Sequence, residues 1–392
     1  MTSTPYVYAK HFFDVILTML IFLEKMYLCR ERKPLTNHLI LVKMQNMKDN
    51  LHKKIHGSLL LLFALALLFP ACHKKEKVTP PKLTKVQETK AKEVTVTVKR
   101  YEQELFSLDV NHLAEGIEQL YGKYPENLIA KDCWKDRDMM AGLKGYLTDP
   151  TIKNLYQETQ KQYSDMEDVT AALNKAMKNY LTHFPDAPVP TIYTLVPGMD
   201  FNLPSVFGYD NDLFVCLDMY LGKDCKYYAL AGMPKFIAAR CERNFIPLDC
   251  FNKGLAYKHL PEKTPVTALD NMIFEGKKLF FTATMFPDAT PQEILGYSDD
   301  KYQWATQYEK QVWQYLIKQN MIYSKDDEVI RRLVDETPFT RDFGNASPGR
   351  LGAFIGLHIV SSYMKNHPET TLQEMMTLTN SQQFLTESLY KP

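Results

Sequence analysis

Two histidines spaced four residues apart on a helix are the strongest sequence signal for a catalytic zinc site, because both imidazoles then face one ion. The chain has ten histidines, and the only pair with this spacing is His52 and His56. Both lie in an N-terminal segment that has the layout of a targeting signal. The histidines of the body are scattered: His112, His183, His259, His358 and His367. The sequence therefore does not predict a zinc hydrolase with the usual ligands.

Cysteine spacing also argues against metal or redox chemistry. The body contains five cysteines, which are Cys133, Cys216, Cys225, Cys241 and Cys250. No C-x-x-C pair occurs among them, so neither a zinc ribbon nor thioredoxin-like chemistry is indicated. We expect buried free thiols, with Cys225–Cys241 or Cys216–Cys250 disulfides as the alternative in an oxidising compartment.

One acidic loop, Asp210-Asn211-Asp212, offers oxygen atoms that calcium accepts as ligands. A turn is the favoured interpretation, because Asp and Asn are common at turn positions. The sequence has no P-loop, no dinucleotide-binding fingerprint and no Gly-x-Ser-x-Gly motif. We therefore expect no cofactor.

The N-terminal part of the chain has the layout of a secretory signal. Lys48, Lys53 and Lys54 precede an apolar run at 58–69, and Ala71-Cys72 follows. We predict cleavage after Ala71 and lipidation of Cys72, with palmitate among the attached acyl chains. The alternatives are a secreted protein cleaved at Ala71 and an uncleaved anchor. Residues 1–46 are then an over-extended, unstructured N-terminus, residues 47–71 the signal peptide, and residues 72–93 the lipidated cysteine with a flexible basic tether.

Charge is distributed unevenly along the chain. Residues 1–72 carry +5 and residues 73–100 carry +6, so residues 101–392 must carry −10 to leave the overall +1. An acidic body lacks the basic field that holds phosphates, which argues against a nucleic-acid partner. A surface-export signal of lipoproteins resembles an acidic run directly after the lipidated cysteine. The run after Cys72 is basic, so we expect a protein that faces the periplasm.

Hydrophobic periodicity predicts a mostly helical α+β domain over residues 94–392, with a small sheet. Expected strands are 94–98, 191–196 and 213–217. Expected helices are 101–121, 139–147, 169–182, 236–251, 267–284, 301–319, 326–336 and 349–366. The last helix carries a row of small residues, Gly349, Gly352 and Gly356, which predicts close packing against another element.

Several short motifs occur in a specific order along the body. They are Arg100–Phe106, Leu217–Gly222, Met272–Phe281 with Glu275-Gly276-Lys277, Gly296-Tyr297, Trp304, Trp313, Pro338–Thr340, Pro348-Gly349-Arg350 and Tyr390–Pro392. In this order they resemble the gliding motility lipoprotein GldB family of Bacteroidetes, from Val94 to Pro392. The resemblance implies a lipoprotein needed for gliding motility or for broader envelope assembly.

A second resemblance, to zinc proteases of the zincin type, implies a fold of that kind that has lost its chemistry. Glu275 would occupy the place of the third zinc ligand and is a weak metal candidate. The helix at 236–251 that would supply the first two ligands contains no histidine. We therefore expect no catalysis, and we expect Glu275 to pair with Arg350 or a nearby lysine.

The sequence thus predicts a membrane-anchored envelope lipoprotein that binds other envelope proteins as a non-catalytic assembly factor. Its expected partners are the membrane, through the lipid anchor, and envelope proteins that the sequence does not identify. Two alternatives stay open: a zinc-dependent peptidase with atypical ligands, and a lipoprotein that binds peptidoglycan or another glycan.

Overall fold

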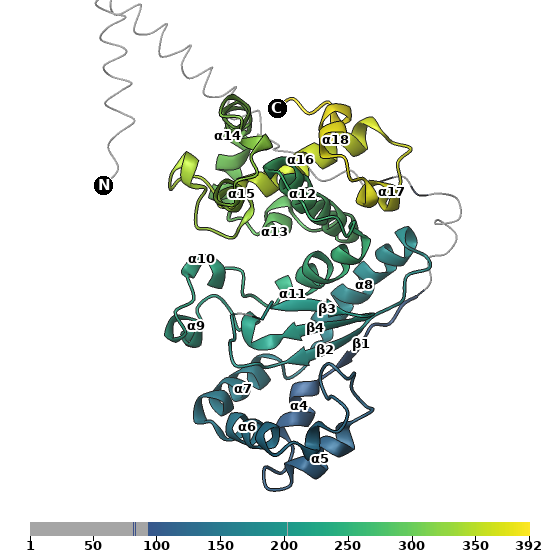
Figure 1. Cartoon of the computed structure of the whole chain (residues 1–392), viewed down its shortest axis with the longest axis vertical. Coiled ribbons are helices and arrows are strands. Elements are labelled where there is room, and N and C mark those ends of the chain that lie inside the picture. The colour runs from purple at the N-terminus through teal and green to yellow at the C-terminus, as the bar shows by residue number, and fades with distance from the viewer. Residues whose placement is uncertain (1–80, 82, 84–92, 202) are drawn as a thin grey trace, which may run out of the picture. The chain divides into compact units, whose positions relative to one another are not determined.

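A four-stranded mixed sheet with helices on both faces organises the protein (Figure 1). The structure is a computed structural model, and it describes residues 81, 83, 93–201 and 203–392. The strand order is β1 (Thr97–Lys99), β2 (Thr191–Leu195), β4 (Asp212–Cys216) and β3 (Val206–Tyr209). β1, β2 and β4 are parallel, and β3 pairs antiparallel with β4 at the edge. β2 and β4 are buried on both sides, which explains their nearly continuous apolar sequence.

The acidic loop is the turn of the β3–β4 hairpin. Tyr209 pairs with Asp212, which leaves Asp210 and Asn211 as the two central turn residues. Asp210 adopts a φ of 49°, a backbone conformation that Asp tolerates better than most residues. Asp212 Oδ1 accepts a hydrogen bond from the backbone of Thr191 at 3.2 Å. The favoured interpretation as a turn is therefore confirmed.

Four helices cover one face of the sheet, below it in Figure 1. They are α4 (Tyr101–Phe106), α5 (Leu113–Leu120), α6 (Arg137–Thr148) and α7 (Pro150–Gln162). The prediction of one helix over 101–121 is wrong. The chain turns at 107–112, where Ser107 Oγ donates to the Glu104 carbonyl and Asp109 accepts from the Asn111 backbone. Such side-chain bonds compete with helix continuation.

The opposite face carries α8 (Glu167–His183) and α11 (Phe245–Asp249), with α9 (Lys226–Leu230) and α10 (Lys235–Ala238) to one side (Figure 1). The prediction of one helix over 236–251 is also wrong. The chain turns between α10 and α11, and Arg243 in this turn reaches toward α8. Its guanidinium donates to Asp168 at 3.0 Å and to the Gln162 carbonyl at 2.6 Å. Beyond α11 a π-helical turn spans Cys250–Gly254.

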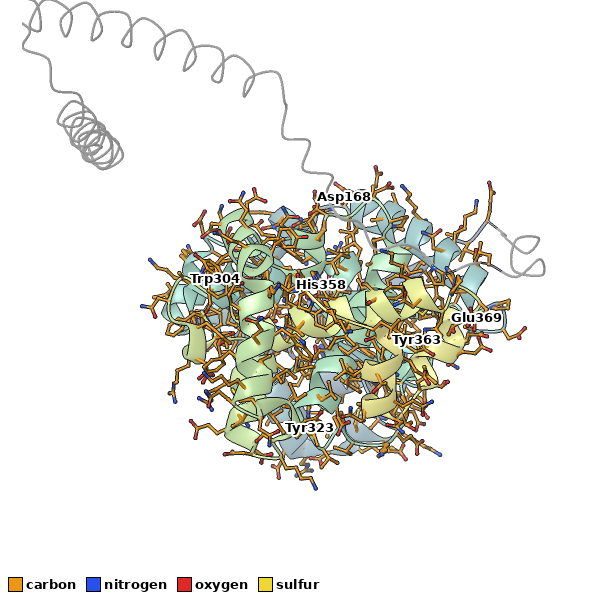
Figure 2. All side chains as sticks on the ribbon, turned by 90° about the horizontal axis from the view of Figure 1, so that it is seen from above. Asp168, Trp304, Tyr323, His358, Tyr363 and Glu369 are labelled. Carbon is orange, nitrogen blue, oxygen red and sulfur yellow. The ribbon has the colours of Figure 1, made fainter. Side chains whose placement is uncertain are left out.

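A second layer is built around two helices that cross at glycines, α12 (Ala268–Met285) and α16 (Leu351–Asn366). A Cβ on Gly276 would overlap the Gly356 backbone, and a Cβ on Gly356 would overlap the Met272 carbonyl. The close packing predicted from the glycine row is therefore confirmed. Around this pair lie α13 (Pro291–Leu295), α14 (Asp299–Lys318), α15 (Asp327–Val334), α17 (Leu372–Thr377) and α18 (Ser381–Ser388). Seen from above, α14 with Trp304 runs beside α16 with His358 (Figure 2).

The predicted class, mostly helical with a small sheet, is confirmed by this arrangement. The described residues 93–201 and 203–392 belong to one compact unit, whose bounds are Lys75–Pro392, and the whole described core lies inside it. Among the described residues, no helix combines the length and apolar composition needed to cross a bilayer. The predicted over-extended N-terminus at 1–46 and the predicted signal peptide at 47–71 lie outside the described residues. So does the predicted tether at 72–93, Cys72 included, except for positions 81, 83 and 93.

The five cysteines of the body are free thiols. Neither alternative pair, Cys225–Cys241 or Cys216–Cys250, forms a disulfide. Cys216, Cys241 and Cys250 are buried. Burial raises the pKa of all three thiols, in the case of Cys241 to about 11. They are therefore protonated, unreactive components of the core.

Candidate functional site: a network of ion pairs

Glu275 and Arg350 form an ion pair between α12 and the start of α16. Arg350 Nη2 donates to Glu275 Oε2 at 3.1 Å, and the two side chains are only 11% and 16% exposed. Arg350 is the residue before the first turn of α16 and has a φ of 56°. Its Nη1 atom lies 3.0 Å from Glu336 Oε1, just beyond α15. One guanidinium thus bridges two carboxylates.

The network continues toward the sheet through Arg240, in the turn after α10. Arg240 Nη1 lies 2.8 Å from Glu336 Oε1, and its Nη2 lies 3.7 Å from Asp249 Oδ1. Glu336 is 44% exposed, so solvent partly screens its charge. Burial raises the pKa of Glu336. The charges of Arg350 and Arg240 lower it by more than burial raises it, so the pKa of Glu336 lies below its ordinary value. Glu336 is therefore ionised at neutral pH.

Asp249, at the end of α11, is the most deeply buried carboxylate of the network, with a side chain 5% exposed. Its Oδ2 atom accepts from the Tyr220 hydroxyl at 2.6 Å and from Lys253 Nζ at 2.7 Å. Burial raises the pKa of Asp249, and Lys253 and Arg240 lower it to below its ordinary value. Asp249 thus keeps its negative charge because two cations and a phenol compensate for the lost water.

Glu275 has a second cationic partner on its own helix. Lys278 Nζ lies 2.8 Å from Glu275 Oε1, one turn away. The same ammonium group donates to the Tyr257 hydroxyl at 2.9 Å and lies 4.6 Å from the centre of the Tyr257 ring. Both carboxylate oxygens of Glu275 are therefore engaged by cations of the chain.

Each carboxylate of the network contacts two cations of the same chain. The members are Glu275, Glu336 and Asp249 with Lys278, Arg350, Arg240 and Lys253. A metal ion would have to displace these cations to reach the carboxylate oxygens. In the part of the chain that the structure describes, no group of three or more His, Cys, Asp or Glu side chains could hold a metal ion. The network's evident physical role is to join six segments: α11, the π-helical turn after it, α12, the start of α16, the turn after α10 and the residues just beyond α15.

The other motif residues fix the helices that carry the network. Lys277 Nζ donates to the Met376 and Leu378 carbonyls at 3.2 and 2.6 Å, and burial lowers its pKa to about 8. Pro348 accepts a 2.8 Å hydrogen bond from the Thr340 backbone. A side chain at Gly349 would collide with the Thr337 carbonyl. These residues, like Gly276 at the helix crossing, hold backbone segments close together.

Only part of this network was predicted from the sequence. The predicted pairing of Glu275 with Arg350 is present, and Lys278 is the nearby lysine. Asp249 and Lys253 were missed, although their spacing of four residues is a common ion-pair signal on helices. Arg240 and Glu336 are 96 positions apart, and no local pattern links them.

Comparison with known proteins identifies a family but no individual relative. No curated protein matches the chain. No solved structure matches it either, so the expected likeness to a zincin-type fold has no support. The family model described as gliding motility protein GldB matches residues 82–392, most of the chain. The chain therefore belongs to the gliding motility protein GldB family.

Proposed function

We propose that this protein is a membrane-anchored lipoprotein of the bacterial cell envelope that acts as a non-catalytic binding or assembly factor for gliding motility or related machinery. Its family supports the link to gliding motility and to lipoproteins. The positive leader, the apolar run and Ala71-Cys72 support lipidation of Cys72. The basic residues that follow Cys72 support a tether lying near anionic headgroups and facing the periplasm.

The ion-pair network is the observation that carries the non-catalytic part of the proposal. A metal-dependent peptidase needs carboxylates or imidazoles with lone pairs directed at an open metal position. Glu275 instead contacts Arg350 and Lys278, at 3.1 and 2.8 Å. Breaking these contacts would leave buried charges uncompensated, which is costly. The arrangement suits a rigid scaffold that presents its surface to partners.

The lipid anchor is tested by metabolic labelling with palmitate in the native bacterium. We expect label on the wild-type protein and on Cys133→Ala, a control that removes another cysteine. We expect no label on Cys72→Ala, and we expect that variant to leave the membrane fraction. Label that persists on Cys72→Ala would overturn the anchor.

The assembly role is tested by crosslinking intact cells and identifying proteins captured with the full chain. We expect a defined envelope protein, captured equally by wild type and by a Glu275→Gln/Arg350→Met double variant present at equal folded levels. Proteolytic products that disappear in this double variant would instead indicate the peptidase. Retention of the purified protein on peptidoglycan without a protein partner would indicate the glycan-binding lipoprotein.

A further inference from the structure

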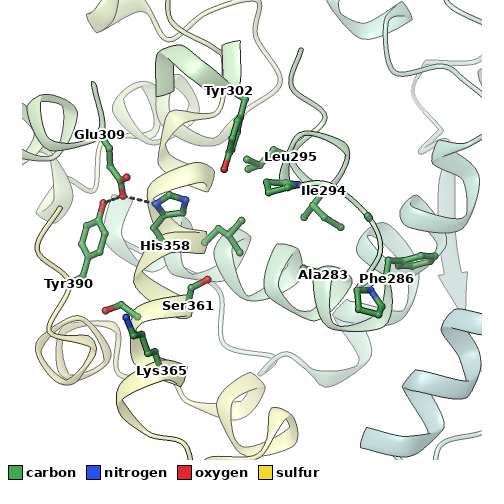
Figure 3. Close-up of a pocket in the computed structure, with 15 residues that line it drawn as sticks. Ala283, Phe286, Ile294, Leu295, Tyr302, Glu309, His358, Ser361, Lys365 and Tyr390 are labelled. Carbon is green, nitrogen blue, oxygen red and sulfur yellow. Dashed lines mark hydrogen bonds and ion pairs between the residues drawn. The ribbon is translucent and has the colours of Figure 1, made fainter. Parts of the chain in front are cut away.

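A cavity of about 360 Å³ lies outside the ion-pair network, between the C-terminal end of α12, α13, α14 and α16 (Figure 3). This volume is within the range typical of small-molecule sites. Its lining is divided, with mostly apolar side chains from α12, α13 and the segment between them on one side, and mostly polar side chains from α14, α16 and the C-terminal segment on the other (Figure 3). Such a division suits a ligand that is itself half apolar and half polar.

The polar wall is built around His358 on α16. Its Nδ1 atom lies 2.6 Å from Glu309 Oε1 on α14, and the Tyr390 hydroxyl donates to the same oxygen at 2.7 Å. Burial raises the pKa of Glu309, but its bonds with His358 and Tyr390 lower it to below its ordinary value. Glu309 accepts the hydrogen bond from His358 Nδ1–H, which leaves Nε2 as the nitrogen that meets a ligand. Nε2 donates to an anion when both ring nitrogens carry a proton.

Two further polar residues extend this wall along α16. Ser361 and Lys365 follow His358 at intervals of three and four residues, so the three side chains share one face of the helix. Figure 3 shows Ser361 and Lys365 on the turns that follow His358, on the polar side of the cavity. Lys365 is exposed, which places its ammonium group at the mouth. An imidazole and an ammonium group about two turns apart form a receptor for an anionic head group.

The facing wall offers only apolar contacts. It includes Ala283 from α12, Phe286 just after α12, Ile294 and Leu295 from α13, and Leu357 from α16. Figure 3 shows Ile294, Leu295 and Phe286 opposite the polar cluster. Burying an alkyl chain here would remove apolar surface from water, which favours binding.

We propose that this cavity binds a small anionic amphiphile, whose alkyl chain lies on the wall formed by α12 and α13 and whose carboxylate is held by His358 and Lys365. The proposal does not depend on the assembly role or on the ion-pair network, since none of those charged residues lines the cavity. Decanoate is the probe, decanol is its uncharged counterpart, and acetate represents the head group alone.

The first experiment measures binding by calorimetry with the Lys75–Pro392 unit. We expect decanoate to bind more tightly than decanol, and acetate to bind undetectably. Lys365→Met should weaken decanoate about two- to fivefold, because exposed charge pairs are individually weak. The same variant should leave decanol unchanged. Lys310→Met, which removes an exposed lysine of α14 outside the cavity, is the matched control. Equal effects of the two lysine variants, or no decanoate binding, would overturn the proposal.

A second experiment locates the bound ligand without relying on a charge change. Ser361→Phe fills the cavity, so both decanoate and decanol should lose affinity, by roughly tenfold. Thermal melting checks that this variant is folded. The ring signals of His358, assigned in nuclear magnetic resonance spectra with His358→Gln, should shift with decanoate but not with acetate. Unshifted His358 signals at saturating decanoate would mean adventitious binding elsewhere and would overturn the proposal.

Discussion

Replacing Arg350 with methionine tests whether the ion-pair network stabilises the fold. The substitution keeps most of the apolar stem but removes the guanidinium that lies 3.1 Å from Glu275 and 3.0 Å from Glu336. Removing one partner of a fully buried pair costs about 3–5 kcal/mol. Here Glu275 retains Lys278, and Glu336 retains Arg240 and is 44% exposed. We therefore expect the free energy of unfolding to fall by about 2–3 kcal/mol, which is less than the cost of breaking a fully buried pair.

Urea denaturation of the Lys75–Pro392 unit at neutral pH measures this loss, with Arg341→Met as the matched control. Arg341 pairs with Glu328 at 3.2 Å, but the two side chains are 72% and 70% exposed. The control should cost less than about 0.5 kcal/mol. Combining Arg350→Met with Glu275→Gln should restore about 1 kcal/mol relative to the sum of the single changes, since each change removes the other's partner. An Arg350→Met cost no larger than that of Arg341→Met would refute the reasoning.

Three other outcomes follow from the structure. Gly356→Ala should lower the free energy of unfolding by about 1–3 kcal/mol through overpacking against α12. Gly142→Ala, where a side chain on α6 meets open space, should raise the free energy of unfolding by about 0.5–1 kcal/mol. Similar urea midpoints for Gly356→Ala and Gly142→Ala would contradict this account of the helix crossing. Burial lowers the pKa of His259 from 6.5 to about 4. His259 therefore takes up a proton more readily in the unfolded chain than in the folded protein. As the pH falls from 6.5 to 4, the wild type should lose more stability than His259→Gln. Stability profiles that run parallel over this pH range would contradict the prediction. Alkylation of the native unit followed by mass spectrometry should label the partly exposed thiols Cys133 and Cys225 and spare the other three, and rapid labelling of all five would contradict their burial.

Local sequence patterns were enough to predict elements that are buried on all sides or that cross closely at glycines. Strands β2 and β4 are buried on both faces, so each appears in the sequence as an apolar run. The glycine row of α16 predicted a close crossing because glycine permits backbones to approach. Glu275 and Arg350 were linked by their place in the family motifs, and the structure adds the distance between them.

Features that depend on tertiary contacts could not be predicted in this way. Periodicity did not reveal the turn between α10 and α11, where Arg243 bonds to Asp168 of α8, because the apolar spacing continues across it. The edge strand β3 is short and half exposed, so it lacks a strong pattern. The cavity also draws its polar wall from three separate segments. Glu309, His358 and Tyr390 converge only when α14, α16 and the C-terminal residues pack together.

The zinc content of the Lys75–Pro392 unit tests the central claim most directly. The unit should be purified from the periplasm without chelators or immobilised nickel, and its metal content measured by mass spectrometry. We predict only trace zinc, because Arg350 and Lys278 already occupy the oxygens of Glu275. Stoichiometric zinc that is lost in Glu275→Gln, with the fold intact, would contradict the account and favour a peptidase.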